Sequence, residues 1–283
     1  MSQVCLVTGI SGGIGRATAV ALAQQGVHVI GVVRDAARGR AAVKEIRERT
    51  PAAEVDLMVA DLGRLDEVRR LAEEVRSRYD HLDVLLHNAG IAVYGPRETT
   101  DDGYERTFAT NHLAPYLLTR LLLDRLDAAG TKPARVITVS SQVHRQVRRI
   151  AWDDLQAEQS YSGVGAYNLS KLANVLFTRA LAERLDRQTT VANAVSPGFV
   201  HTGLNRGATP PYRIFFALMR PLQRSPQTGA ETSVWAAVSP EAAAVTGEYF
   251  EKCRPAKTSE LAQDRAAAER LWAASAELCG MAP

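Results

Sequence analysis

Short apolar runs and longer amphipathic stretches alternate along most of the chain. The apolar runs are of strand length and nearly free of polar residues, which is typical of strands buried on both faces. The stretches between them have the helical period, with one apolar face. Strands that alternate with helices predict an α/β fold with a doubly wound parallel sheet. We expect seven strands in a single domain spanning residues 1–283, at residues 4–8, 27–33, 55–60, 82–86, 135–140, 190–195 and 247–250.

A glycine-rich turn at residues 9–15 joins the first expected strand to the first helix. Glycines here allow a tight turn, let the backbone approach a pyrophosphate and let the helix pack against the sheet, while the start of the helix faces the phosphates. The stretch at residues 4–33 therefore predicts a Rossmann-type dinucleotide-binding unit. A purely structural turn remains the alternative, because a glycine-rich turn alone is weak evidence.

A second motif, Tyr167-Asn168-Leu169-Ser170-Lys171, begins a long amphipathic stretch. A spacing of four residues puts the phenol of Tyr167 and the ammonium of Lys171 on one face of a helix. A nearby cation favours the phenolate, so the pair can protonate an alkoxide or deprotonate an alcohol. The alternative is that both residues belong to a solvated helix surface.

Taken together, the spacing Thr8-Gly9-x-x-x-Gly13-x-Gly15 and the downstream Tyr167 and Lys171 resemble the short-chain dehydrogenase/reductase family over nearly the whole chain. The residues at 166–178, and a late Leu271-Trp272 followed by Ser275, are most similar to the retinol-dehydrogenase-like branch. This resemblance implies hydride transfer between a nicotinamide and a lipophilic aldehyde or ketone, or the corresponding alcohol. Many eukaryotic relatives carry an N-terminal membrane anchor, whereas no apolar run in this sequence is long enough for one. We therefore do not carry a retinoid substrate over to this chain.

The resemblance also implies which residues bind the cofactor, from the phosphates through the adenine and ribose to the nicotinamide. His87 stands where the family has a first Asn, and the small residues after it leave room for the adenosine. The residues so assigned are Gly9, Ser11, Gly13, Ile14, Gly15, Arg34, Asp61, Leu62, Asn88, Ala89, Gly90, Tyr167, Lys171, Pro197, Val200 and Thr202.

The end of the second strand distinguishes two cofactors. An acidic side chain there accepts hydrogen bonds from the ribose 2′-hydroxyl of NAD, whereas an arginine suits the 2′-phosphate of NADP. In the family pattern the acidic position is Val33, which has no acceptor, and Arg34 follows it. We therefore predict NADP (NADPH), with Asp35 available to cap the next helix. The alternative is that Arg34 is an exposed loop cation.

Two further residues complete the predicted catalytic set of Asn111, Ser141, Tyr167 and Lys171. Ser141 follows the fifth strand, and the family pattern gives it the role of hydrogen-bonding the substrate oxygen near the phenol. The expected helix at residues 101–126 contains Asn111 and Pro115. A proline there bends the helix, and the resemblance implies that Asn111 holds a water linked to Lys171. Asp61 is a second capping candidate, for the helix from about residue 65.

Substrate selection is assigned to two segments. Residues 144–165, with Trp152, Asp153, Leu155 and Tyr161, are expected to wall part of the pocket. Residues 203–224 contain an apolar cluster at 214–219 and predict a substrate lid and a lipophilic substrate. A weak membrane-surface contact of the lid is the rival interpretation. A tailoring ketoreductase of a natural-product pathway and a non-catalytic dinucleotide-binding regulator are the alternative functions.

Composition excludes several other classes. The net charge of +3 and the interspersed charges give no reason to expect nucleic acid. Cys5, Cys253 and Cys279 lack the spacing of a metal site or a disulfide framework. No apolar run reaches the length of a membrane span, so we predict a cytoplasmic protein. The resemblance allows a homodimer through the helices at 101–126 and 166–185, whose outward faces carry Arg179, Glu183 and Arg184.

Overall fold

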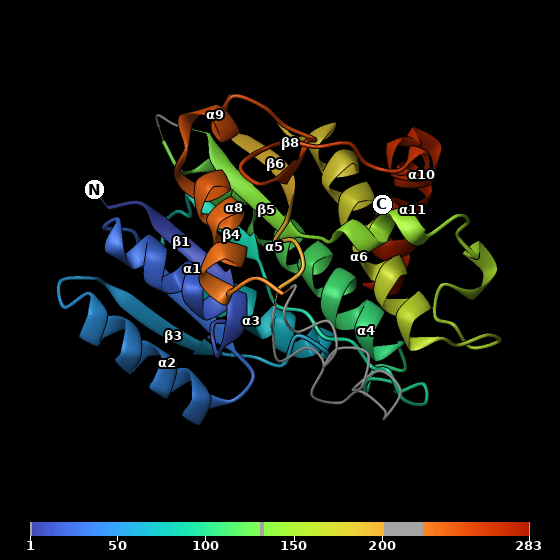
Figure 1. The fold of residues 1–283 in the computed structure, drawn as a ribbon, viewed down its shortest axis with the longest axis horizontal. Coiled ribbons are helices and arrows are strands. Elements are labelled where there is room, and N and C mark those ends of the chain that lie inside the picture. The colour runs from blue at the N-terminus through green and yellow to red at the C-terminus, as the bar shows by residue number, and fades with distance from the viewer. Residues whose placement is uncertain (1, 131–132, 201–222, 283) are drawn as a thin grey trace.

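The computed structural model describes residues 2–130, 133–200 and 223–282. Its strands form one sheet in the order β3-β2-β1-β4-β5-β6-β7-β8, parallel from β3 to β7 (Figure 1). The doubly wound parallel sheet is confirmed. The strands are β1 (Val4–Thr8), β2 (His28–Val33), β3 (Val55–Val59), β4 (Val84–His87), β5 (Ala134–Val139), β6 (Thr190–Ser196), β7 (Tyr249–Glu251) and β8 (Arg254–Pro255).

The count of seven strands was one too few. The extra strand, β8, has two residues and pairs antiparallel with β7 through a tight turn at Lys252 and Cys253, both with positive φ. So short a strand has no hydrophobic period, and therefore the sequence pattern did not reveal it.

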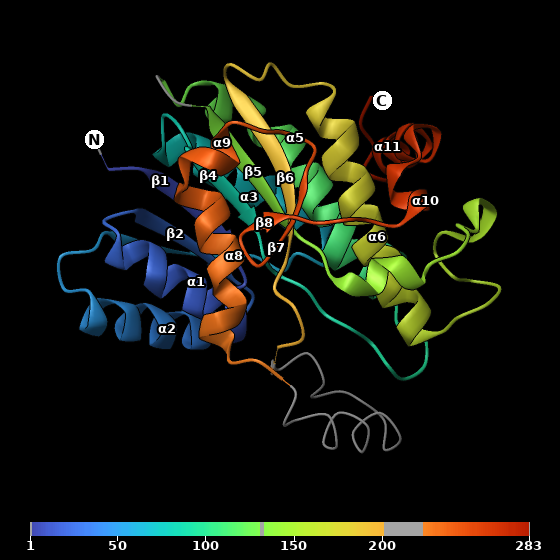
Figure 2. The same cartoon turned by 45° about the horizontal axis from the view of Figure 1, so that its top comes forward.

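Helices cover both faces of the sheet (Figures 1 and 2). One apolar core lies between the sheet and α1, α2 and α8, and the other between the sheet and α3, α5, α6 and α11. Alternate residues of β1 enter opposite cores, which explains its continuous apolar run. The helices are α1 (Gly13–Gln24), α2 (Ala36–Arg49), α3 (Leu65–Arg78), α4 (Arg106–Phe108), α5 (Ala114–Asp127), α6 (Gly163–Ala182), α8 (Pro226–Val238), α9 (Pro240–Ala243), α10 (Glu260–Gln263) and α11 (Arg265–Leu278), with 3₁₀ turns η2 (Gln142–Gln146) and η3 (Trp152–Asp154).

The helix expected at residues 101–126 begins later and is not a continuous α-helix. Its first turn, α4, starts only after Glu105, whose carboxylate accepts hydrogen bonds from Thr107 N and Phe108 N. A π-helical turn, η1 (Ala109–Leu113), then precedes Pro115 in α5. The proline lacks the N–H that an unbroken α-helix needs, so the expected distortion is present as a π-turn.

The C-terminal helix α11 packs on α6 and reaches α5 (Figure 2). Arg184, which follows the end of α6, forms a bidentate ion pair with Glu269, and Glu183 pairs with Arg265. Glu183 and Arg184 were expected on a face open to a second copy of the chain. That part of the face is engaged within the chain, and the homodimer remains a prediction.

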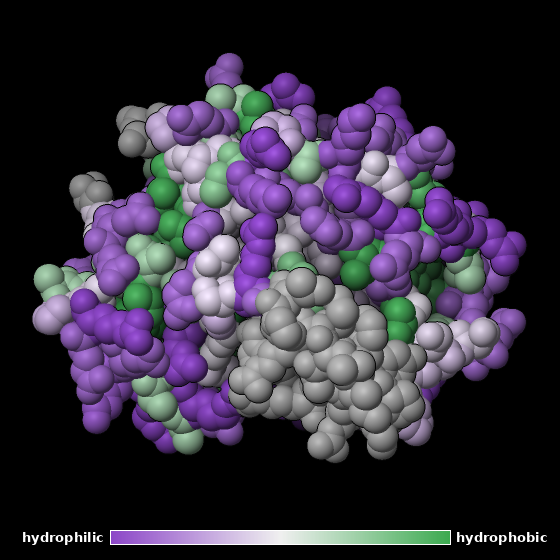
Figure 3. Space-filling view, in the orientation of Figure 1, coloured by the Kyte–Doolittle hydropathy of each residue, from purple (hydrophilic) through white to green (hydrophobic). Residues whose placement is uncertain are grey.

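The lid expected at 203–224 lies almost entirely outside the described residues. In the face shown in Figure 3 the described residues are mostly hydrophilic, and apolar side chains appear in small separated groups. Among the described residues the large hydrophobic side chains that are exposed are Val59, Phe199 and Val245. Within those same ranges, no helix is long and apolar enough to cross a membrane.

Candidate active site

A cleft of about 1390 Å³ lies at the carboxyl ends of the strands. It exceeds the volume typical of a pocket for a drug-sized ligand, so it has room for an extended molecule. It opens where β1 has neighbours β2 and β4 on opposite sides, the position at which open α/β sheets bind ligands. All the residues assigned to the cofactor line this cleft except Thr202, which lies outside the described residues. Ser141 of the predicted catalytic set lines the cleft as well.

The glycine turn is fixed by a positive φ and by a close approach of backbone. Gly9 has φ of 81°, and a Cβ on Gly15 would lie 2.3 Å from Gly9 O and from Asn88 Nδ2. Thr8 joins the ends of β1 and β4, because its Oγ1 accepts hydrogen bonds of 3.0 Å from Asn88 N and Ala89 N. No side-chain hydrogen bond caps the start of α1. The arrangement leaves the positive end of this helix without a side-chain cap, and a phosphate site here remains a prediction.

Two guanidinium groups border the cleft beside this turn. Arg34 follows the buried Val33, and Arg38 extends from α2 toward the glycine turn, with an Nη2 3.9 Å from the position of a Cβ on Gly12. Asp35 caps α2 by accepting a 2.9 Å hydrogen bond from Arg38 N, which lowers its pKa. Its carboxylate therefore has the capping role that was expected. Arg38 was missed by the sequence prediction.

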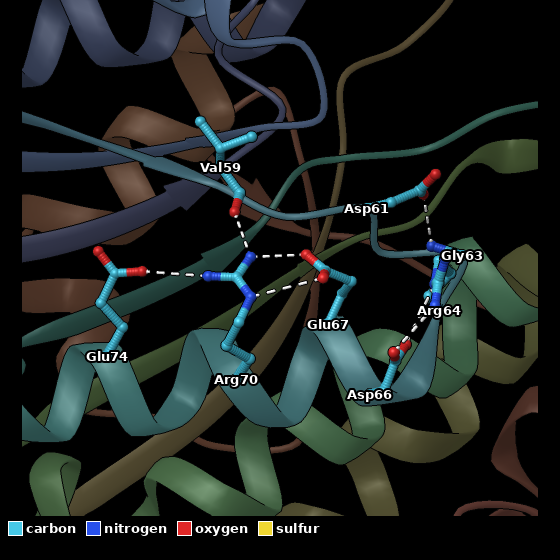
Figure 4. A network of polar contacts seen from close by, with 8 residues as sticks. All are labelled: Val59, Asp61, Gly63, Arg64, Asp66, Glu67, Arg70 and Glu74. Carbon is cyan, nitrogen blue, oxygen red and sulfur yellow. Dashed lines mark hydrogen bonds and ion pairs between the residues drawn. The ribbon is translucent and has the colours of Figure 1, made fainter.

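The adenine edge of the predicted site is formed by residues after β3. Asp61 Oδ1 accepts a 2.9 Å hydrogen bond from Gly63 N, as Figure 4 shows. The capping role considered for Asp61 on α3 is wrong, because the first amide of that helix, Leu65 N, donates to Asp102 Oδ2 instead. Asp61 thus shapes the turn that precedes α3, with Leu62 beside it in the cleft wall.

Arg70 of α3 fixes the strand from which this turn leaves (Figure 4). Its Nη2 donates 2.6 Å hydrogen bonds to the carbonyl oxygen of Val59 and to Glu67, and Nη1 contacts Glu74 at 3.4 Å. Val59 ends the edge strand β3. The guanidinium occupies an acceptor on an open strand edge and ties the edge to α3.

Ser141 and Tyr167 form the polar centre of the other end of the cleft. Both residues line the cleft, and burial raises the pKa of Tyr167 although the neighbouring Ser141 hydroxyl lowers it. Ser141 Oγ accepts a hydrogen bond of 3.4 Å from Val143 N, which leaves its proton for donation. His144 Nδ1 contacts Ser141 O at 2.7 Å and fixes this turn from behind. The two predicted residues are brought together as expected.

Lys171 lies one helical turn from Tyr167, with its Nζ 5.7 Å from the centre of the phenol ring. Its ammonium is buried and donates a 3.0 Å hydrogen bond to Val139 O. Burial lowers the Lys171 pKa to about 8, so the group is mostly charged at neutral pH. Burial also raises the pKa of Tyr167, and Tyr94 raises it further. In this structure desolvation therefore outweighs the expected effect of the lysine on the phenol.

Asn111 does not line the cleft, yet it supports the same helix. Its Nδ2 donates to Ile91 O at 2.9 Å and to Ser170 Oγ at 3.0 Å, and Ser170 Oγ donates to Tyr167 O at 2.7 Å. A Cβ on Gly90 would lie 3.4 Å from Asn111 Oδ1 and 3.5 Å from Lys171 Nζ. The absent side chain leaves a narrow gap between the amide and the ammonium.

The segment at residues 144–165 contributes to the wall of the cleft, but not through the four residues named for it. Gln146 and Val164 line the cleft, but Trp152 packs beside Arg270 and Tyr161 donates its hydroxyl to Val93 O. Asp153 and Leu155 also lie outside the wall. These orientations depend on tertiary contacts that a segment without a clear period does not reveal. The cleft residues outside that segment that sequence reasoning missed here are Ile91, Ala92, Tyr94, Thr110, Val143, Asn168 and Phe199.

His87 has a structural role. It is buried, and its Nε2 lies 2.7 Å from Thr119 Oγ1. Burial lowers its pKa to about 3, so it is neutral. Among the described residues no cluster of His, Cys, Asp and Glu has the geometry of a metal site.

Comparison with known proteins gives consistent matches. Residues 3–212 match the family model for short chain dehydrogenase. The chain is 38% identical to retinol dehydrogenase 12 of Mus musculus over 281 residues, covering 99% of this chain and 87% of that protein. It is also 38% identical to human retinol dehydrogenase 13 over 285 residues, covering 99% of this chain and 85% of that protein.

Solved structures show the same fold over most of the chain. An uncharacterized protein of Mycobacterium paratuberculosis is 33% identical with a TM-score of 0.79, covering 99% of this chain and 94% of that one. A short chain dehydrogenase of Escherichia coli CFT073 complexed with NADPH is 26% identical with a TM-score of 0.68, covering 88% of this chain and 95% of that one.

Proposed function

Because the chain belongs to the short chain dehydrogenase family, we propose that it is an NADP(H)-dependent oxidoreductase acting on a lipophilic ketone or aldehyde, or on the corresponding alcohol. One observation carries the proposal. Ser141 and Tyr167, with Lys171 beside the phenol ring, line the same cleft as the glycine turn.

The bare glycines of the turn fit a dinucleotide, since a side chain on Gly15 would collide with backbone. The bound cofactor supplies or accepts the hydride at its nicotinamide. In reduction, Ser141 donates a hydrogen bond to the carbonyl oxygen, and Tyr167 gives its proton to that oxygen as the hydride reaches the carbon. Oxidation of the alcohol reverses the proton transfer and the hydride transfer. The Lys171 ammonium stabilises the phenolate and binds ribose hydroxyls.

Asn111 supports this arrangement from behind the cleft. It fixes Ser170, which in turn accepts and donates hydrogen bonds that hold the backbone of Tyr167. The gap beside Gly90 has polar groups of Asn111 and Lys171 on its two sides, which suits a bridging water. We assign Asn111 to hold that water, through which Lys171 recovers a proton after turnover.

The choice of NADP rests on Arg34 and Arg38 beside the glycine turn and on the absence of an acceptor at Val33. The NADPH complex of a structural relative supports it. We expect Arg38→Ala to raise KM for NADPH by about tenfold or more, because a charged hydrogen bond contributes about 1.5–3 kcal/mol. KM for NADH stays unchanged. Arg40→Ala, an exposed arginine of the same helix, is the matched control.

A lipophilic substrate is supported by the apolar wall at Val143, Val164 and Phe199 and by the relatives named retinol dehydrogenase. The hydrogen bond from Asn168 Nδ2 to Gln146 Oε1, 3.0 Å, is a polar exception at this end. A ketoreductase that tailors a natural product fits the same wall. A cytoplasmic location remains a prediction.

Oxidation of NADPH with a panel of lipophilic ketones and aldehydes tests the proposal. Tyr167→Phe should lower kcat by about 10²–10⁴-fold, the usual contribution of a general acid, with cofactor affinity retained. Tyr161→Phe removes a hydroxyl that bonds to Val93 O and should leave kcat unchanged. Full turnover by Tyr167→Phe would contradict the assigned acid. Tight NADPH binding without turnover of any carbonyl would favour the non-catalytic regulator.

A further inference from the structure

The chain before Ser141 is fixed by the sheet and by helix α6. Ser140 donates from its backbone N to Val195 O at 2.8 Å, and its Oγ donates to Lys171 O at 2.7 Å. Ser141 itself has an extended backbone and then begins the 3₁₀ turn η2. The position of Ser141 in the cleft therefore also depends on what holds the chain after it.

That second side is held by His144. Its backbone N donates to Ser141 O at 3.1 Å, and its Nδ1 lies 2.7 Å from the same oxygen. Its other ring nitrogen, Nε2, accepts a 3.4 Å hydrogen bond from Ser259 N, 115 residues further along the chain. The side chain is buried, and its ring meets the edge of the Tyr249 ring with 5.0 Å between ring centres. One imidazole thus joins the turn after Ser141 to residues 249–259, which contain β7 and β8 and lead into α10.

The two partners of the imidazole determine where its proton lies. A backbone carbonyl oxygen can only accept a hydrogen bond, and a backbone N–H can only donate one. Nδ1 therefore carries the proton and donates it to Ser141 O, while Nε2 keeps a lone pair for Ser259 N. Burial lowers the His144 pKa, so the ring is neutral at neutral pH, the form in which both bonds can exist. Each ring nitrogen then has a partner of the correct kind.

Two further contacts dock η2 on residues 249–259. Gln142 Nε2 donates to Glu251 Oε2 at 3.1 Å, and Arg145 pairs with Glu251 at 3.6 Å and donates to Lys257 O. These contacts lie at the surface, where water and salt weaken them. The buried bonds of His144 are shielded, so they are the stronger link between the two segments.

We propose that His144 is a positioning residue through which residues 249–259 hold Ser141 in the wall of the cleft. The inference rests on the proposed function, in which Ser141 donates a hydrogen bond to the substrate oxygen. His144 does not line the cleft, so it acts through the serine backbone. Without the ring, Ser141 O keeps only the bond from the backbone N of residue 144, and the serine can turn away from the reacting oxygen. A misplacement of about 1 Å can cost about 10²-fold in rate.

Two substitutions at His144 separate positioning from packing. His144→Asn places an amide N–H near the position of Nδ1, so it can still donate to Ser141 O, but it removes the ring from Tyr249. His144→Phe keeps a ring against Tyr249 and removes both side-chain hydrogen bonds. In ketone reduction by the full chain with NADPH, His144→Phe should lower kcat by about tenfold or more and leave the Kd for NADPH unchanged. His144→Asn should keep kcat within about threefold of the wild type.

A role in packing alone gives the opposite order, because phenylalanine then replaces the ring better than asparagine. That order, or equal losses of kcat in the two variants, or no loss in either, would overturn the inference. His112→Phe is the matched control. It removes another buried histidine, whose Nε2 lies 2.8 Å from Ser275 Oγ and which does not line the cleft, and it should leave kcat unchanged. A loss of kcat there as large as in His144→Phe would show general loosening of the fold and would equally overturn the inference.

A second measurement needs no turnover and therefore separates this inference from the proposed function. Deuterium exchange at Ser259 N should be faster in both His144 variants than in the wild type, by about fivefold or more, because its acceptor is lost. Ala262 N, which donates to Ser259 Oγ at 3.3 Å, should exchange at an unchanged rate. Unchanged exchange at Ser259 N would overturn the inference. Faster exchange in a protein whose wild type reduces no carbonyl would overturn the proposed function alone.

Discussion

Replacing Lys171 by methionine should stabilise the cofactor-free protein while abolishing turnover. The lysine is 4% exposed, and burial lowers its pKa from 10.5 to about 8. Since one pKa unit equals about 1.4 kcal/mol, keeping the charged form inside the fold costs about 3 kcal/mol at neutral pH. Methionine has a similar length and no charge. Val139 O keeps its hydrogen bond from Asn174, so the substitution leaves no acceptor unpaired.

The dependence on pH identifies the cause. A lysine with a lower pKa in the folded state binds fewer protons when folded, so the wild type gains stability as pH rises from about 8 to 10.5. The advantage of Lys171→Met should therefore be largest below pH 8 and shrink toward zero near pH 10.5. Urea unfolding of both proteins at several pH values measures the difference directly.

Comparing the two proteins removes the contribution of all other titrating groups. Lys44→Met, at a lysine whose side chain is 79% exposed, should show no such trend. If the difference between Lys171→Met and the wild type were the same at pH 7 and pH 10, the buried-charge reasoning would be refuted. A destabilised Lys171→Met at pH 7 would refute it equally.

Two further substitutions test the glycine turn and the C-terminal helix. Gly15→Ala places a Cβ 2.3 Å from Gly9 O, which forces the turn to move, and NADPH affinity in a fluorescence titration should fall by about tenfold or more; an unchanged Kd would show that the turn is not the phosphate site. Trp272→Ala removes the ring packed against Phe177 and Tyr116, and the free energy of unfolding should fall by about 3–5 kcal/mol in urea, as for other buried aromatic side chains. A loss below 1 kcal/mol would mean that α11 is not held by this ring.

Local patterns accounted for the framework of the molecule. The apolar runs gave the parallel strands because a strand covered on both faces must be apolar throughout. The glycine turn could be read directly, since only glycine permits the close approach at Gly15. The spacing of Tyr167 and Lys171 and the cap at Asp35 follow from helix geometry, which acts over a few residues.

What escaped the sequence depends on contacts between distant segments. The direction of the Arg38 side chain and the packing of Trp152 away from the cleft are set by neighbours far along the chain. Distant neighbours also set the late start of α4, where the buried Glu105 carboxylate takes the capping position.

The amino-acid order by itself determined which chemical groups the site contains and the local spacing between them. Only the tertiary structure decided their electrostatics. Burial raises the pKa of Tyr167 and lowers that of Lys171, although the sequence alone implied that the cation would govern the phenol. The reason is physical: spacing along a helix fixes which side chains are neighbours, but desolvation depends on everything that the fold packs around them.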